Sequence, residues 1–406
     1  MMTIDYFYCA FITKTRHFTP ISETKKQNLL KKQFCCPINT HTDTPKSKAK
    51  IMIEIDGSLL EGGGQVLRMS VALSALLKKP IRIFNIRGNR AKPGLRAQHL
   101  SGLKLVHQLT GGQMEGCQLH SPEIIYKPDT IQNNPQNNFE MDIGNNGAIS
   151  LLVQICLPVA LFRAKTTDFT LKGGTFGDFA PPMIYCQQVF VPMLQKHFGL
   201  DSTLQIMQES SDMKGGGHVN LQVRPLKTLQ PLNLTQEEPV EDILLTCNTS
   251  GKAPFKLASK ASKAAQSILQ QQPNSNLTIQ NEFLPEALGT ALTLFIKAQT
   301  PNSILAASKI SQKRSENPDH LGAKTAQELK ETLDLGVPVD QWMQDQLIIY
   351  MALASGTSRL LTGPLTLHTR TAISIAEQLT SARFKVTLKE DKKFVIECQG
   401  IGFSAP

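Results

Sequence analysis

A run of three glycines between charged side chains is the first feature of this sequence that could bind a phosphate group. It reads Glu61-Gly62-Gly63-Gly64-Gln65-Val66-Leu67-Arg68 and separates a strand-like segment from a helix-like one. Glycines at such a junction let backbone N–H groups approach an anion, and the positive end of the helix dipole adds to the attraction. The spacing matches neither the dinucleotide fingerprint nor the P-loop. Taken alone, the run indicates either an anion site or a simple tight turn.

A second loop carries four cations within ten positions, namely Arg87, Arg90, Lys92 and Arg96. Gly and Pro residues lie between them, a composition that excludes a core segment. Guanidinium groups bind phosphate oxygens through two parallel hydrogen bonds. The loop therefore indicates a phosphate-binding segment, with a solvated surface loop as the alternative.

His368 is the candidate nucleophile. The alternation in Leu365-Thr366-Leu367-His368-Thr369-Arg370-Thr371 predicts a strand with Thr366, His368 and Arg370 on one face, followed by a helix from Ala372. An imidazole nitrogen attacks an α-phosphorus well, and a neighbouring cation stabilises the charge that develops. The alternative is a histidine with a purely structural role.

Trp342 is the single tryptophan of the chain and lies four residues before Gln346. A lone tryptophan is most often a packing residue. A surface on which a base stacks is the more specific interpretation.

The elements that must position these residues alternate between strand and helix. The pattern predicts strands over residues 51–56 and 81–86 and helices over residues 65–77 and 98–109. Comparable units from 139 to about 198 and after 338 predict an α+β fold built on a repeated β-α-β-α-β-β plan. Residues 228–336 break the rhythm and predict an inserted α/β domain, which leaves 52–227 and 337–406 as the core.

Residues 1–51 differ from the rest of the chain. They lack sustained apolar periodicity, and the pattern changes abruptly at Met52, which could itself be a natural start. We expect this extension to lie outside the fold, as an upstream mis-start, a flexible tail or a targeting peptide. It has no continuous apolar region, so a secretory signal is not predicted.

The composition is that of a folded protein with an anionic partner. Hydrophobic residues make up 41% and the net charge is +10, of which the extension supplies +6. The eight cysteines show no paired metal-ligand spacing, which indicates free thiols in a reducing compartment. Residues 143–162 are uncharged but contain two Asn, Gln154 and Pro158, so we expect a buried element and no membrane association.

Taken together and in order, the glycine loop, the arginine loop, Asp345-Gln346 and His368 resemble the RNA 3'-terminal phosphate cyclase family. The resemblance covers residues 54–402, including Ile396-Glu397-Cys398-Gln399-Gly400-Ile401-Gly402 near the end. It implies three β-α-β-α-β-β units with a smaller inserted domain. It also implies the cofactors ATP and a divalent metal, Mg or Mn, and RNA 3' ends bearing a phosphate as substrate. A cytoplasmic location is expected, or a nuclear one if the protein is eukaryotic.

The resemblance also implies roles for individual residues. His368 would take AMP from ATP as a phosphoramidate, the AMP would pass to the RNA 3'-phosphate, and the 2'-hydroxyl would expel it to close the ring. Glu61 would be catalytic and hold the metal, and Arg68, Arg87, Arg90 and Gln98 would bind phosphates. The nucleotide pocket would also include Gln154, Asp345 and Gln346, and adenine would stack between Trp342 and Pro181.

Some positions depart from the family pattern, namely Asn145-Asn146-Gly147-Ala148, Phe176, Ile184 and Asp212-Met213-Lys214. These departures indicate altered substrate contacts or rate. A non-catalytic RNA-binding, ribosome-assembly protein on the same fold is the alternative function. Retention of His368 and Glu61 favours the enzyme.

Overall fold

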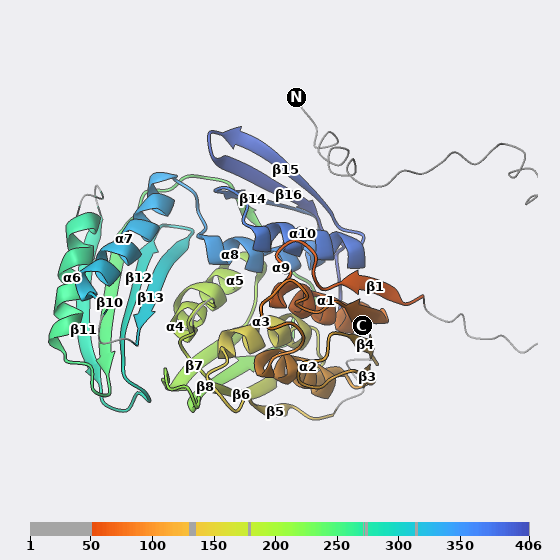
Figure 1. The fold of residues 1–406 in the computed structure, drawn as a ribbon. Helices are drawn as coiled ribbons and strands as arrows, with labels where there is room; N and C mark the ends of the chain where they lie inside the picture. The colour runs from red at the N-terminus through yellow and green to blue at the C-terminus, as the bar shows by residue number, and fades with distance from the viewer. Residues whose placement is uncertain are drawn as a thin grey trace, which may run out of the picture. The chain divides into compact units, whose positions relative to one another are not determined.

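A computed structural model describes residues 51–129, 135–177, 180–270, 272, 275–312 and 316–405. The described residues form one compact unit. The predicted N-terminal extension lies outside the described residues except for Ile51. The α+β fold class is confirmed, because in the described part of the chain helices alternate with strands that form four small mixed sheets (Figure 1).

The first sheet contains the glycine loop and the arginine loop between its strands. Strand order is β1-β2-β4-β3, with β1 parallel to β2 and the other pairs antiparallel. Helix α1 begins one residue earlier than predicted, and α2 extends one residue further at each end. The elements are β1 (Ile53–Asp56), α1 (Gly64–Leu77), β2 (Ile81–Phe84), α2 (Ala97–Thr110), β3 (Gln113–Glu115) and β4 (Ile124–Lys127).

The second sheet has the same arrangement, with strand order β5-β6-β8-β7 and its first two strands parallel. Between its second and third strands along the chain, β6 and β7, lies a continuous helical segment that contains a π-helical turn, η4. The elements are β5 (Asn138–Asp142), α3 (Ile149–Ala160), β6 (Thr167–Gly173), α4 (Met183–Tyr185), η4 (Cys186–Phe190), α5 (Val191–Phe198), β7 (Ser202–Gln208) and β8 (Gly217–Val223).

The third sheet has strand order β15-β16-β14-β9 and carries the two segments with Trp342 and His368. If its strands are numbered along the chain, their order across the sheet from β9 is first, second, fourth, third, as in the other two sheets. Strands β9 and β14 are parallel. The elements are β9 (Asn233–Leu234), α8 (Gln341–Gln346), α9 (Ile348–Leu353), β14 (Thr357–Thr362), α10 (Leu367–Leu379), β15 (Arg383–Glu390) and β16 (Lys393–Gln399).

Residues 242–334 build a fourth sheet, with its own hydrophobic cluster and strand order β11-β10-β12-β13. Helices α6 and α7 pack on each other and on this sheet (Figure 1). The predicted insertion began at residue 228, whereas β9 inside that range pairs with β14 of the third sheet. The elements are β10 (Asp242–Ser250), α6 (Lys256–Leu269), β11 (Asn276–Leu284), β12 (Ala291–Gln299), β13 (Ile304–Ser311) and α7 (Pro318–Asp334).

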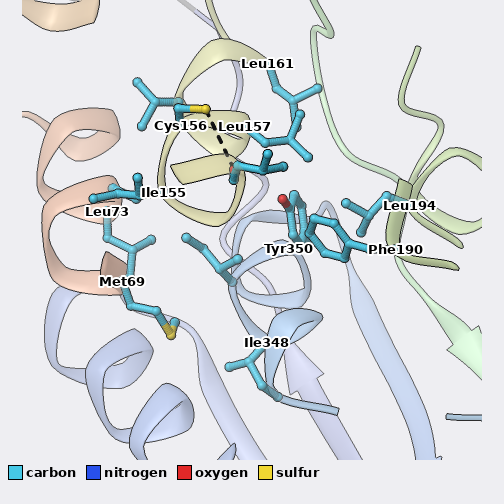
Figure 2. Close-up of a cluster of buried hydrophobic side chains, with 14 of the residues drawn as sticks. Met69, Leu73, Ile155, Cys156, Leu157, Leu161, Phe190, Leu194, Ile348 and Tyr350 are labelled. Atoms are coloured by element: carbon cyan, nitrogen blue, oxygen red, sulfur yellow. Dashed lines mark hydrogen bonds between the residues drawn. The ribbon is translucent and has the colours of Figure 1, made fainter. Parts of the chain in front are cut away.

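Each of the first three sheets forms one unit with its helices. Helices from all three of these units meet in one hydrophobic core. Figure 2 shows side chains of α1, α3, η4, α5 and α9 packed together, and Phe190 and Tyr350 have ring centroids 6.2 Å apart. Burying these apolar surfaces is the main force that holds the units together. The labelled residues are Met69, Leu73, Ile155, Cys156, Leu157, Leu161, Phe190, Leu194, Ile348 and Tyr350.

Most of the uncharged stretch 143–162 forms helix α3, which is buried, as predicted, except at the partly exposed Gln154. No helix in the described part of the chain has the length and apolar character needed to cross a bilayer. The described cysteines, namely Cys117, Cys156, Cys186, Cys247 and Cys398, are all free thiols.

Candidate active site

The glycine loop brings two later side chains over the start of α1. Gly62 has φ +59°, in the left-handed region that glycine adopts without strain. At Gly64 an added Cβ would lie 2.7 Å from His99 Nε2 and 2.8 Å from Arg68 Nη1. A side chain at position 64 would therefore displace the His99 imidazole or the Arg68 guanidinium from this helix N-terminus.

Glu61 links this loop to the helix that carries His368. Its main-chain N–H donates to Thr371 Oγ1 on α10 at 3.3 Å, and its side chain forms an ion pair with Arg90. The Glu61 side chain is only 8% exposed, and its Oε2 is buried without a protein partner. A buried carboxylate oxygen without a hydrogen-bond donor is the kind of ligand that a hard divalent cation takes.

Among the described residues, no group of three or more His, Cys, Asp or Glu side chains could hold a metal ion. A divalent cation bound here would take Glu61 as one ligand beside phosphate oxygens and water, which is a common arrangement for Mg²⁺.

His368 lies in a helix, so the predicted strand over residues 365–371 is wrong. Helix α10 begins at Leu367, five residues before the predicted start at Ala372, and His368 is its second residue. The Thr366 hydroxyl oxygen accepts from the Thr369 N–H at 3.1 Å and caps the helix. The alternation of polar residues was therefore the start of a helix, with Thr366 as its cap.

Two arginines from the first unit act on the His368 imidazole. The pKa of His368 is lowered by partial burial and then by the positive charges of Arg68 and Arg90. A lower pKa keeps more of the imidazole neutral near pH 7, which is the form that can attack an electrophile. The fold thus brings together Glu61, Arg68, Arg90 and His368, which come from the two ends of the folded region.

A chain of hydrogen bonds joins α1 to α8. Arg68 Nη2 donates to Gln65 Oε1 at 2.6 Å, and Gln65 Nε2 donates to Asp345 Oδ2 at 2.9 Å. Burial lowers the pKa of Arg68 to about 10, so it stays charged at neutral pH. Burial also raises the pKa of Asp345 to about 7, although the charge of Arg68 opposes that rise.

These side chains line a small cavity, and several of its polar atoms have no partner. The buried atoms Arg68 Nε, Gln346 Oε1 and Tyr350 OH form no hydrogen bond within the described structure. Gln154 of α3 and Gln346 of α8 both line this cavity. The complete lining is Gln65, Arg68, Met69, Gln154, Phe190, Asp345, Gln346, Ile349 and Tyr350.

Trp342 lies half-buried on α8, with its ring edge-on to Tyr185 at a centroid distance of 5.0 Å. The Tyr185 hydroxyl donates to Asp340 Oδ1 at 2.8 Å, and the same oxygen caps α8. Pro181 is buried in the segment that leads into α4, four residues before Tyr185. The third unit thus presents its tryptophan to the helical segment that follows Pro181.

The remaining predicted residues lie around this region with other partners. Arg87 Nη1 donates to the carbonyl oxygens of Lys92 at 2.6 Å and Gly94 at 3.1 Å, so its guanidinium closes its own loop. Gln98 Oε1 accepts from the Ala148 N–H at 3.3 Å, where α3 begins. Neither Arg87 nor Gln98 lines the cavity.

His99 is a site residue that the sequence interpretation passed over. Its Nδ1 accepts from the Arg96 N–H at 3.1 Å, so the proton of the neutral ring is on Nε2, beside Gly64 and Arg68. Burial, together with the charges of Arg68, Arg87 and Arg96, lowers its pKa to about 3. The feature of the sequence that could have identified His99 is its position three residues after the N-cap of α2.

Two of the segments that depart from the family pattern, around Asn146 and around Met213, contact each other. The Asn146 N–H donates to Met213 O at 3.2 Å, and Asn146 Nδ2 donates to Met213 Sδ at 3.1 Å. Asn145 forms part of the same contact, because a Cβ at Gly215 would meet its backbone. The Phe176 side chain lines a second pocket beside Ser211, and Ile184 packs on the core.

The sequence matches the profile of the RNA 3'-terminal phosphate cyclase family over residues 59–386. An RNA 3'-terminal phosphate cyclase of Drosophila melanogaster is 36% identical over 358 residues, which cover 87% of this chain and 98% of that protein. One from Ignicoccus hospitalis is 35% identical over 359 residues, covering 86% and 99%. A protein of Dictyostelium discoideum named as a probable cyclase is 32% identical over 396 residues, covering 93% and 91%. The profile match includes Glu61, His368 and every residue that lines the cavity.

Proposed function

The chain belongs to the RNA 3'-terminal phosphate cyclase family, and from that membership we propose that it converts an RNA 3'-phosphate to a 2',3'-cyclic phosphodiester with ATP, through a covalent histidine–AMP intermediate. The enzyme is of the ligase type, and its family acts on RNA ends bearing a 3'-phosphate. The intermediate is assigned to His368.

The observation that carries this proposal is the effect of Arg68 and Arg90 on His368. Both cations lie close enough to lower its pKa, and Glu61 hydrogen-bonds to the same helix. A neutral imidazole beside fixed positive charge suits attack on a phosphorus atom, because the charge that moves onto the leaving group is stabilised.

Three steps follow from this arrangement. A ring nitrogen of His368 attacks the α-phosphorus of ATP, the bond to the β-phosphate oxygen breaks, and pyrophosphate leaves. An oxygen of the RNA 3'-phosphate then attacks the same phosphorus and releases the imidazole, which gives an RNA–adenylate. Finally the 2'-hydroxyl attacks the RNA phosphorus, loses its proton and expels AMP as the ring closes.

The other residues bind and orient the reactants in this proposal. Arg68 and Arg90 hold the triphosphate, with Arg87 and Gln98 placed for phosphate contacts at the edge of the site. Gln154, Asp345 and Gln346 form the nucleotide pocket, and adenine stacks on Trp342 beside Pro181.

We also propose that Glu61 binds a divalent cation, Mg²⁺ or Mn²⁺, through its unpartnered Oε2. The bound cation would neutralise charge on the triphosphate and so make pyrophosphate a better leaving group.

The test is labelling of the purified protein with ATP that carries the label in its α-phosphate. We expect an adduct that is stable to base and labile to acid, which is the signature of a phosphoramidate, and no adduct from ATP labelled in the γ-phosphate. His368→Ala should abolish the adduct while the protein stays folded. A folded wild-type protein that never labels would instead support an RNA-binding protein without catalytic activity.

A further inference from the structure

The side chain of Gln344 is buried in α8, and its amide nitrogen is bonded to the segment that follows β14. Its exposed fraction is 2%. Nε2 donates to the Thr362 hydroxyl and lies 3.3 Å from Pro364 O and 3.4 Å from Gly363 O. One amide group therefore attaches α8 to the end of β14 and to the loop that leads into α10.

The amide oxygen of Gln344 is bonded to the first turn of α10. Oε1 accepts from the Thr366 N–H at 3.0 Å and from the Thr369 hydroxyl. Thr366 is the N-cap, and Thr369 is completely buried. Gln344 thus contacts a residue on each side of His368.

The His368 imidazole depends on this turn for its position. Within the described residues the ring makes no hydrogen bond, and the residue is exposed to solvent. Its location is therefore set by the backbone of α10 and by rotation about its own side-chain bonds. Holding the first turn of the helix therefore helps to fix where this ring starts.

Helix α8 also carries the residues that face the nucleotide in the proposed function. Trp342 lies two positions before Gln344, and Asp345 follows it with its bond to Gln65. Helix α8 is only six residues long. The buried Gln344 amide therefore connects the helix that would bind the nucleotide to α10, the helix that carries His368.

We propose that Gln344 is a positioning residue that holds His368 at the distance from the bound nucleotide that attack requires, with the Thr369 hydroxyl as its partner. The proposal rests on the proposed function of His368. Gln344 does not line the cavity, so it acts through the backbone of α10 and not through contact with the nucleotide.

The predicted effect is on rate rather than on nucleotide affinity. A misplacement of about 1 Å between reacting groups can lower a rate by about 10²-fold. We therefore expect loss of the Gln344 bonds to lower the adenylation rate constant by about 10- to 100-fold. ATP affinity should change by less than about threefold, because no group that contacts the nucleotide is removed.

The experiment measures single-turnover self-adenylation of the full chain at saturating ATP, together with ATP affinity. Gln344→Met keeps the length and burial of the side chain and removes every hydrogen bond. Thr369→Val removes only the hydroxyl, whereas Thr369→Ser retains it. Gln195→Met is the control for loss of a glutamine hydrogen bond elsewhere, because the exposed Gln195 donates from Nε2 to Ser202 O at 2.6 Å in the second unit, on a different helix.

We expect Gln344→Met and Thr369→Val to label slowly with nearly unchanged ATP affinity, and Thr369→Ser and Gln195→Met to label at close to the wild-type rate. Wild-type labelling by folded Gln344→Met overturns the proposal. If Gln344→Met does not fold, equal rates for Thr369→Val and Thr369→Ser overturn it.

Backbone hydrogen exchange distinguishes failure of this proposal from failure of the proposed function. Even in a protein that does not adenylate, Gln344→Met should speed exchange over residues 366–370 by at least about tenfold relative to Gln195→Met. Unchanged exchange there would show that Gln344 does not hold the turn.

Discussion

The main-chain N–H of Glu61 donates to the side-chain oxygen of Thr371, 310 residues further along the chain, at 3.3 Å. This contact joins the glycine loop of the first unit to the helix of the third unit that carries His368. The carboxylate proposed to bind metal and the imidazole proposed to attack are thereby attached to the same helical turn. Disturbing either element should therefore affect the other.

Glu61→Gln should lower the adenylation rate by at least about 100-fold, because a neutral amide oxygen holds a divalent cation more weakly than a carboxylate does, and the charge stabilisation that the cation supplies is lost with it. Pyrophosphate release measured over a Mg²⁺ titration checks this. Glu54→Gln, an exposed residue paired with Arg82, is the control and should behave as wild type. Full activity of Glu61→Gln at low Mg²⁺ would refute the assignment.

Arg90→Gln should raise the pKa of His368, because one of the cations that lowers it is removed. Adenylation falls with decreasing pH as the imidazole becomes protonated, so this acid limb should move to higher pH in the variant. Titration of the His368 resonance by NMR measures the pKa directly. Arg82→Gln, which changes an arginine paired with Glu54 and Glu123, should leave the titration where it is.

Trp342→Ala should weaken ATP binding by about 5- to 150-fold, since stacking of a base on an aromatic ring is worth about 1–3 kcal/mol. Trp342→Phe should retain most of the affinity. Equilibrium binding of ATP checks both variants. Phe283→Ala removes an aromatic side chain that is 46% exposed in the fourth sheet, and it should have no effect. An unchanged affinity of Trp342→Ala would place the adenine elsewhere.

Gly64→Ala should destabilise the protein and impair adenylation, because its Cβ would lie 2.7 Å from His99 Nε2 and 2.8 Å from Arg68 Nη1. Overpacking costs about 1–3 kcal/mol, which exceeds the gain of up to about 1 kcal/mol from the helix propensity of alanine. Denaturant unfolding measures the difference. At Gly177 the added Cβ meets only Ala148 Cβ at 3.6 Å, so Gly177→Ala should be nearly neutral for stability.

Asp345→Asn should flatten the pH dependence of stability. Burial raises the pKa of Asp345 from 3.8 to about 7, so the folded state binds a proton that the unfolded state has released between these values. The contribution of Asp345 to stability therefore falls as pH rises from about 4 to about 7, and the amide variant lacks this loss. Urea unfolding at pH 5 and pH 8 checks it. An equal slope in the variant would contradict the prediction, and Asp201→Asn, which alters an exposed pair with Arg224, is the control.

The spacing of apolar residues predicted the positions of helices and strands well wherever an element buries the face on which those residues recur. The predicted strand and helix positions in the first unit agree with β1, α1, β2 and α2 to within about two residues, and the uncharged stretch became the buried helix α3. Burial depends there on the spacing of apolar residues along one segment, which the sequence displays directly.

The His368 segment shows where prediction from residue spacing failed. Its alternating polar residues resembled a strand, but the Thr366 hydroxyl caps a helix and Gln344, 22 residues earlier, accepts a hydrogen bond from the Thr366 backbone. The capping threonine was readable from the sequence, whereas the bond from Gln344 was not. His99 was passed over for a similar reason, since its neighbours Gly64 and Arg68 lie about thirty residues away.

The amino-acid sequence alone determined which groups this protein has for chemistry, namely a glycine loop, a cluster of arginines, one carboxylate and one histidine, because residue type sets charge and nucleophilicity. Only the tertiary structure decided that Glu61 and Arg90 pair beside α10 and that Gln65, Arg68 and Asp345 share a cavity wall. Such contacts depend on how helices of separate units pack in one core, and side-chain periodicity within a segment carries no information about which distant segment it will meet.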